Sequence, residues 1–165
     1  MVSKSKILGK PPLVLVSVGS TKFPFVRLLS VFDRVDKKKY KIVKEFLPTD
    51  QFIKIIKKAD KIIVHGGPGT IFLAVKYAKN MPLAIPRLAK YKEHVDDHQL
   101  FFCKYLKNML PKYLQKYFVT EEKIDKIVYR YLEEQKIGND LNKFLFKNIN
   151  IDKLVSNLKN YVNSI

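Results

Sequence analysis

Segments of two kinds alternate along most of the chain: short runs rich in apolar residues, and longer stretches whose apolar residues recur every three to four positions. The short runs lie at residues 13–18, 40–46, 62–64 and 82–86. Near-continuous apolar runs of this length are typical of strands buried on both faces of a parallel sheet. The periodic stretches, at about 24–35, 49–59, 70–80 and 100–106, predict helices. The alternation therefore predicts an α/β fold, with right-handed crossovers and helices on both faces of a parallel sheet.

Two further helical stripes follow residue 119. The first is predicted to begin at Thr120 and comprises Ile124, Ile127, Val128, Tyr131 and Leu132. The second comprises Ile151, Leu154, Val155, Leu158 and Val162. An amphipathic stripe either packs into the core of its own domain or offers a surface to a partner. Both interpretations remain open for these two stripes.

A glycine-rich turn joins the third predicted strand to its helix. Gly66, Gly67 and Gly69 let the backbone bend sharply and approach another molecule closely. Thr70 is a suitable N-cap for the helix that follows. A helix that begins here directs free backbone N–H groups and its positive end towards the crevice above the sheet. This arrangement favours an anion, most often a phosphate group.

The turn does not complete either of the common nucleotide-binding patterns. No Lys-Ser/Thr pair follows the last glycine, and Phe72 stands where a third dinucleotide-binding glycine is required. A tight turn without a ligand is therefore the alternative interpretation. His65 at the end of the strand favours a phosphate site, because a ring N–H could donate to a phosphate oxygen.

A second cluster of polar residues precedes the helix at 100–106. It comprises Glu93, His94, Asp96, Asp97, His98 and Gln99. His94 and His98 are spaced for one helix face, but Val95 stands where zinc peptidases have their glutamate, so we expect no metal site. Acids can also decorate a helix N-terminus for electrostatic reasons. The mixture of donors and acceptors favours recognition of hydroxyl groups.

Charge and composition limit the possible partners and compartments. The 165 residues predict one domain, and the net charge of +17 suggests an anionic partner such as a nucleic acid, a membrane surface or an acidic protein. Only four residues are arginine, which counts against sequence-specific nucleic-acid recognition, and AT-rich codon usage is another source of the lysines. The single cysteine fits a reducing compartment. Without a signal peptide or a long apolar segment, we expect a cytoplasmic protein, at most peripheral to the cytoplasmic face of a membrane.

Read together, the two polar stretches resemble the C-terminal, donor-binding domain of family-28 glycosyltransferases. The resemblance is strongest to the half-sized catalytic subunits of two-chain enzymes, namely bacterial exopolysaccharide transferases and the eukaryotic enzyme that adds the second N-acetylglucosamine to dolichyl diphosphate. It covers roughly Leu13–Leu106. The matching positions are Leu13–Thr21, His65–Thr70, Ala74, Pro82, Pro86, Arg87 and Glu93–Gln99, in order and spacing.

This resemblance implies a Rossmann-like fold, one half of a GT-B architecture, that binds a UDP-sugar. It places the diphosphate on the turn from Gly66 to Thr70, including Gly67 and Gly69, with His65 beside it. It also implies that one set of residues contacts the hydroxyl groups of the ribose and the sugar, namely Glu93, Asp96, Asp97, His98 and Gln99. A second set would line the acceptor side of the cleft, namely Gly19, Ser20 and Thr21. The implied reaction inverts the anomeric centre without a metal or other cofactor.

The resemblance further implies a lipid-linked saccharide acceptor and a membrane-attached second subunit, which could supply the unassigned general base. We therefore divide the chain into a tail (1–12), a UDP-sugar-binding domain (13–119) and a helical C-terminal extension (120–165). Family members have one more strand where this chain has only Asp36–Lys39, so either the sheet is one strand short or a segment is missing. Two other function classes remain: a non-catalytic companion of such an enzyme, and a basic module that binds anions or nucleic acid.

Overall fold

Four parallel strands form one sheet within the residues that the computed structural model describes, which are 10–19, 22–44, 47–135 and 138–148. The strands are β1 (Leu13–Ser17), β2 (Lys41–Val43), β3 (Lys61–His65) and β4 (Leu83–Ile85). Their spatial order is β2-β1-β3-β4, and each neighbouring pair is parallel. The predicted Rossmann-like α/β fold is therefore confirmed.

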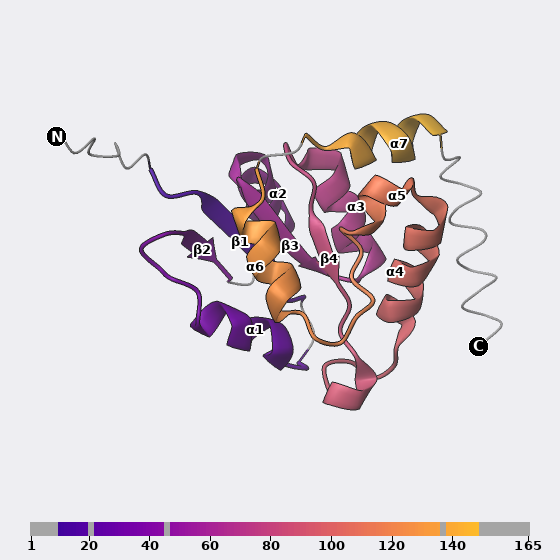
Figure 1. Ribbon diagram of the computed structural model, residues 1–165, viewed down its shortest axis with the longest axis horizontal. Coiled ribbons are helices and arrows are strands. Elements are labelled where there is room, and N and C mark those ends of the chain that lie inside the picture. The colour runs from indigo at the N-terminus through magenta and orange to yellow at the C-terminus, as the bar shows by residue number, and fades with distance from the viewer. Residues whose placement is uncertain (1–9, 20–21, 45–46, 136–137, 149–165) are drawn as a thin grey trace, which may run out of the picture.

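Helices cover both faces of the sheet. They are α1 (Val26–Asp33), α2 (Thr49–Lys58), α3 (Pro68–Tyr77), the short 3-10 helix η1 (Ala89–Tyr91), α4 (His98–Met109), α5 (Lys112–Gln115), α6 (Asp125–Glu133) and α7 (Asp140–Asn148). Figure 1 shows α6 crossing one face with α1 beside it, while α2 and α3 lie behind the sheet. Strand β3 is buried along its whole length because it has neighbours on both sides and helices on both faces. This position explains its uninterrupted apolar sequence.

The two edges of the sheet differ. Strand β2 follows α1 after a short turn and carries an exposed Lys41 at the edge. Strand β4 is covered on its outer side, where Ala84 N–H donates to Tyr117 O at 2.8 Å and Val119 N–H donates to Ala84 O at 2.9 Å. Over the described part of the chain, the sheet has four strands and no strand lies between α1 and β2.

Helix α6 packs on the sheet. Its predicted stripe is buried, including Val128 and Leu132. The Tyr131 hydroxyl accepts a hydrogen bond from Ile62 N–H at 3.1 Å and donates to Met81 O at 2.7 Å. The first stripe is therefore part of the core rather than a free surface for a partner. The second stripe, at 151–162, lies outside the described residues.

Two predicted helix starts are wrong. The helix expected from Thr120 begins at Asp125, because the preceding segment is held extended against β4 up to Val119. The helix expected at Thr70 begins at Pro68, with Gly67 as its N-cap. Proline is favoured at the first helical position because its fixed φ suits the helix and its missing N–H is not needed there. Thr70 is consequently the third helical residue.

The strand order defines a switch point between β1 and β3. The chain leaves β1 towards β2 on one side and leaves β3 towards β4 on the other. Ligands of open α/β sheets bind at such points, in the crevice beyond the carboxyl ends of the strands. The residues that follow β1, β3 and β4 are therefore the first place to look for a site.

Candidate functional site

Three strand ends converge at this edge of the sheet. Gly19 follows β1, His65 ends β3, and Arg87 lies just beyond β4. Gly19 has a φ of +83°, and a Cβ there would lie 2.6 Å from His65 Cδ2 and 3.2 Å from Arg87 Cζ. Glycine at this position therefore lets the imidazole and the guanidinium group lie against the end of β1. Ser20 and Thr21, predicted beside Gly19, lie outside the described residues.

The glycine turn holds His65 in one orientation. The Gly67 N–H donates to His65 Nδ1 at 2.9 Å, so the hydrogen of the neutral ring is on Nε2. That Nε2 lies 3.2 Å from the Thr70 hydroxyl. A Cβ on Gly67 would lie 2.4 Å from His65 Cε1, so a side chain there would displace the ring. The turn and the histidine are thus one packed unit.

His65 is uncharged at neutral pH. Burial, and after it the nearby positive charge of Arg87, lowers the pKa of the imidazole to about 4. Burial also lowers the pKa of Arg87, and the Glu93 carboxylate opposes that effect. The His65 ring is therefore a neutral donor through Nε2, and any formal positive charge beside it comes from Arg87.

A cavity of about 290 Å³ opens beside His65, between the ends of β1 and β3 and the starts of α2 and α3. Its lining residues are Ser17, Val18, Gly19, Leu47, Pro48, Thr49, Phe52, His65, Thr70 and Leu73. This volume is close to the lower limit of roughly 300 Å³ for small-molecule sites. The described part of the chain therefore provides room for a portion of a nucleotide-sized ligand.

Three of the residues predicted to bind hydroxyl groups are used within the protein. The fully buried Glu93 carboxylate forms an ion pair with Arg27, Nη2 to Oε2, at 2.8 Å, and also accepts from Leu88 N–H at 3.1 Å. Asp97 Oδ1 accepts from Ala89 N–H at 2.8 Å. These contacts fix the loop between β4 and α4.

The buried Gln99 fixes the same loop from the first turn of α4. Its Oε1 accepts from the backbone N–H of Arg87 at 3.1 Å. Gln99 thus helps to set the backbone position of Arg87.

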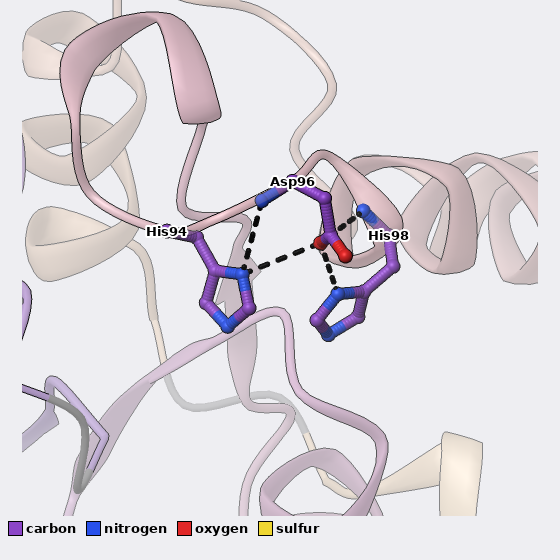
Figure 2. Close-up of side chains that lie close together, drawn as sticks. All are labelled: His94, Asp96 and His98. Carbon is purple, nitrogen blue, oxygen red and sulfur yellow. Dashed lines mark hydrogen bonds and ion pairs between the residues drawn. The ribbon is translucent and has the colours of Figure 1, made fainter.

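The remaining polar residues of this segment lie together, with Asp96 and His98 exposed and His94 largely covered. Helix α4 begins at His98, so His94 belongs to the preceding loop and not to the helix. Figure 2 nevertheless shows the imidazoles of His94 and His98 on either side of Asp96. His94 Nδ1 lies 3.3 Å from Asp96 Oδ1, and His98 Nδ1 contacts the same oxygen. The segment therefore combines residues that bond to the protein frame with a cluster that is partly open to solvent.

The family model of the glycosyltransferase family 28 C-terminal domain matches residues 31–153. The chain belongs to this family. The match extends from within α1 beyond α7 and includes both the glycine turn and the segment from Glu93 to Gln99. No curated protein and no solved structure matches the chain. Membership of family 28 indicates a glycosyltransferase role and binding of a nucleotide-sugar donor.

Sequence reasoning missed two parts of this family 28 site. Arg27, which pairs with Glu93, lies 66 residues away in sequence, and no local pattern connects the two. The start of α2, with Pro48 and Thr49, lines the cavity. That contribution could have been inferred, because the helix after β2 also begins at the carboxyl edge of the sheet.

Proposed function

We propose that the chain is the donor-binding subunit of an inverting glycosyltransferase that uses a UDP-sugar. The observation that carries this proposal is the placement of the glycine turn and the start of α3 beside a cavity at the switch point of a family 28 domain. The first N–H groups of a helix have no acceptor within the helix, so they are available to a diphosphate.

The chemistry of the leaving group supports the same placement. When the sugar leaves, negative charge develops on the diphosphate, and fixed donors stabilise such charge without having to reorganise. The start of α3, the neutral His65 ring and the buried Arg87 are donors of this kind. We assign the diphosphate to the turn from Gly66 to Thr70 on this basis.

The sugar and acceptor sides are assigned by accessibility and by family resemblance. Asp96 and His98 are directed outward and are the candidates for hydroxyl contacts. Glu93, Asp97 and Gln99 are proposed to position the loop that carries them. The backbone around Gly19 would line the acceptor side.

We further propose that the enzyme acts on a lipid-linked saccharide with a membrane-attached second subunit. The cavity holds only part of a nucleotide sugar, and the family match is to a C-terminal domain, one half of a GT-B enzyme. The second subunit would close the cleft and supply the general base. In the described part of the chain, no helix is long and apolar enough to cross a bilayer. The net charge of +17 would favour an anionic lipid surface.

Charge placed at Gly69 tests the diphosphate assignment. Gly69 is exposed at the second position of α3, and a Cβ there meets no atom within 4 Å. Gly69→Glu should leave stability unchanged or higher, because an acid suits a helix N-terminus. It should weaken UDP binding roughly tenfold or more relative to Gly69→Gln, since each charge pair in water at 4 Å is worth about 1 kcal/mol.

Calorimetric titration with UDP at low and high salt gives the measurement, with Gly69→Gln as the matched steric control. Screening should narrow the difference between the two variants as salt rises. Equal affinities of the two variants would place the diphosphate elsewhere. Failure of the unmodified protein to bind UDP would refute the proposal that the donor is a UDP-sugar.

The partner proposal has a separate test. The isolated chain should bind UDP but transfer no sugar to a lipid-linked acceptor. Co-expression with the companion subunit should restore transfer and bring the chain into the membrane fraction. Robust turnover by the isolated chain would refute the need for a partner.

A further inference from the structure

The cluster of His94, Asp96 and His98 offers a second kind of chemistry. Each residue provides one ligand-type atom, and the three atoms lie within 4.8 Å of one another. We propose that these three side chains bind a divalent transition metal ion of the Zn²⁺ type. A bound ion would take the place of direct hydroxyl contacts by Asp96 and His98, and the proposal does not depend on the identity of the donor sugar or on a partner.

One pair of ligand atoms already has the separation expected in a metal site. His94 Nδ1 lies 3.3 Å from Asp96 Oδ1, and His98 Nδ1 contacts the same carboxylate oxygen. Ligand atoms about 2.0–2.1 Å from a tetrahedral Zn²⁺ are separated by roughly 3.3 Å. Figure 2 shows both rings turned towards Asp96, with their centroids 4.5 Å apart. A small opening of this cluster would admit an ion.

The frame around the cluster is fixed by the residues that alternate with it. Glu93 is anchored to Arg27, Asp97 to the backbone of Ala89, and Gln99 to the backbone of Arg87. A metal site requires ligands that are held by such surrounding contacts. His94 and Asp96 on this loop, and His98 at the start of α4, therefore project from a frame that does not have to be ordered when an ion binds.

The donor set selects the class of ion. Two imidazole nitrogens and one carboxylate oxygen suit Zn²⁺ and neighbouring transition metals, whereas Mg²⁺ and Ca²⁺ prefer oxygen ligands. Three protein ligands leave positions for exchangeable groups. The sequence-based expectation of no metal site rested on comparison with the helix of zinc peptidases, in which both histidines lie on one helix. Here His94 lies on the loop before α4, and this loop brings it close to Asp96.

The experiment uses untagged, full-length protein freed of metal with a chelator. Zn²⁺ is titrated by calorimetry, and Co²⁺ by its visible absorption. We expect one ion per chain. Asp96→Asn, His94→Ala and His98→Ala should each weaken binding at least about tenfold, because losing even an outer-shell partner typically costs 10–100-fold.

A matched control retains the cluster. Asp50→Asn removes an exposed carboxylate in the first turn of α2. This variant should keep the affinity of the unmodified protein, and circular dichroism confirms that every variant is folded. If the unmodified protein binds neither ion, or if the three cluster variants bind as tightly as Asp50→Asn, the proposal is overturned.

Discussion

The contact between Arg27 and Glu93 makes a sharp prediction about stability. Glu93 is fully buried, and both of its carboxylate oxygens accept hydrogen bonds from the Arg27 side chain, at 3.0–3.1 Å from Nε. The Glu93 carboxylate also accepts from the backbone N–H of Arg27 near the start of α1 at 3.2 Å. The substitution Glu93→Gln keeps the size of the side chain but removes the negative charge and turns two donors towards the guanidinium group.

The expected cost follows from burial. Removing one partner of a buried ion pair typically costs about 3–5 kcal/mol, because the other charge is left uncompensated. The Arg27 side chain keeps a 14% exposed fraction and a bond to Pro86 O, so we expect the lower end, about 3 kcal/mol. For a chain of this length, that corresponds to a melting temperature lower by roughly 6–12 °C.

The chain provides a matched control in a second arginine–carboxylate pair. The side chains of Arg34 and Asp125 are 60% and 47% exposed. Asp125→Asn should therefore cost no more than about 1 kcal/mol. Thermal melting and urea unfolding of the two variants give the comparison. Equal losses for both variants, or a loss below about 1 kcal/mol for Glu93→Gln, would refute the reasoning from burial.

Two further predictions concern the crevice. Because the pKa of His65 is about 4 in the folded protein and 6.5 for an unperturbed imidazole, unfolded chains take up the proton first as the pH falls. The unfolding free energy should therefore drop by up to about 3 kcal/mol between pH 7 and pH 4 because of this group. His65→Gln should remove that part of the pH dependence, measured by urea titrations at several pH values. Identical pH slopes for the variant and the unmodified protein would contradict this prediction. Gln99→Ala should lower the unfolding free energy by about 1–3 kcal/mol, because the Arg87 N–H loses its acceptor; an unchanged melting curve would assign Gln99 no structural role.

The sequence was sufficient for the features that are local. The run of apolar residues in β3 and the glycines after it specify a buried strand and a turn within a few residues of each other. The start of α3 was misplaced because Thr70 was favoured as a cap over the proline at the first helical position. Both residues are acceptable near a helix start, and the packing of the turn around His65 determines which of them begins the helix.

The features that depend on distant contacts could not be predicted. Glu93 and Gln99 looked equivalent to their neighbours, because a polar residue in a sequence does not show whether its partner is a ligand or the protein. Arg27 settles the role of Glu93 only after the fold brings α1 to the loop before α4. In the same way, the sequence pattern showed that α6 is amphipathic but did not show the surface against which its apolar stripe packs.

The distribution of buried polar groups connects the fold to the site. Among the described residues, the buried charged or strongly polar side chains are Lys61, His65, Arg87, Glu93 and Gln99. Four of these five lie at the carboxyl edge of the sheet, around the loop after β4. Burying such groups is costly unless each has a partner, so a fold gains little stability from collecting them at one end.

The gathering of these buried polar groups at one edge of the sheet is therefore better explained by function than by stability. Arginine keeps its charge when buried and binds carboxylates in a fixed geometry, and two of the four arginines, Arg27 and Arg87, lie in this region. Lysines produce most of the net charge of +17, and those in the described part of the chain lie largely at the surface. The net charge alone thus does not mark the site, whereas the buried network that positions Arg87 beside His65 does.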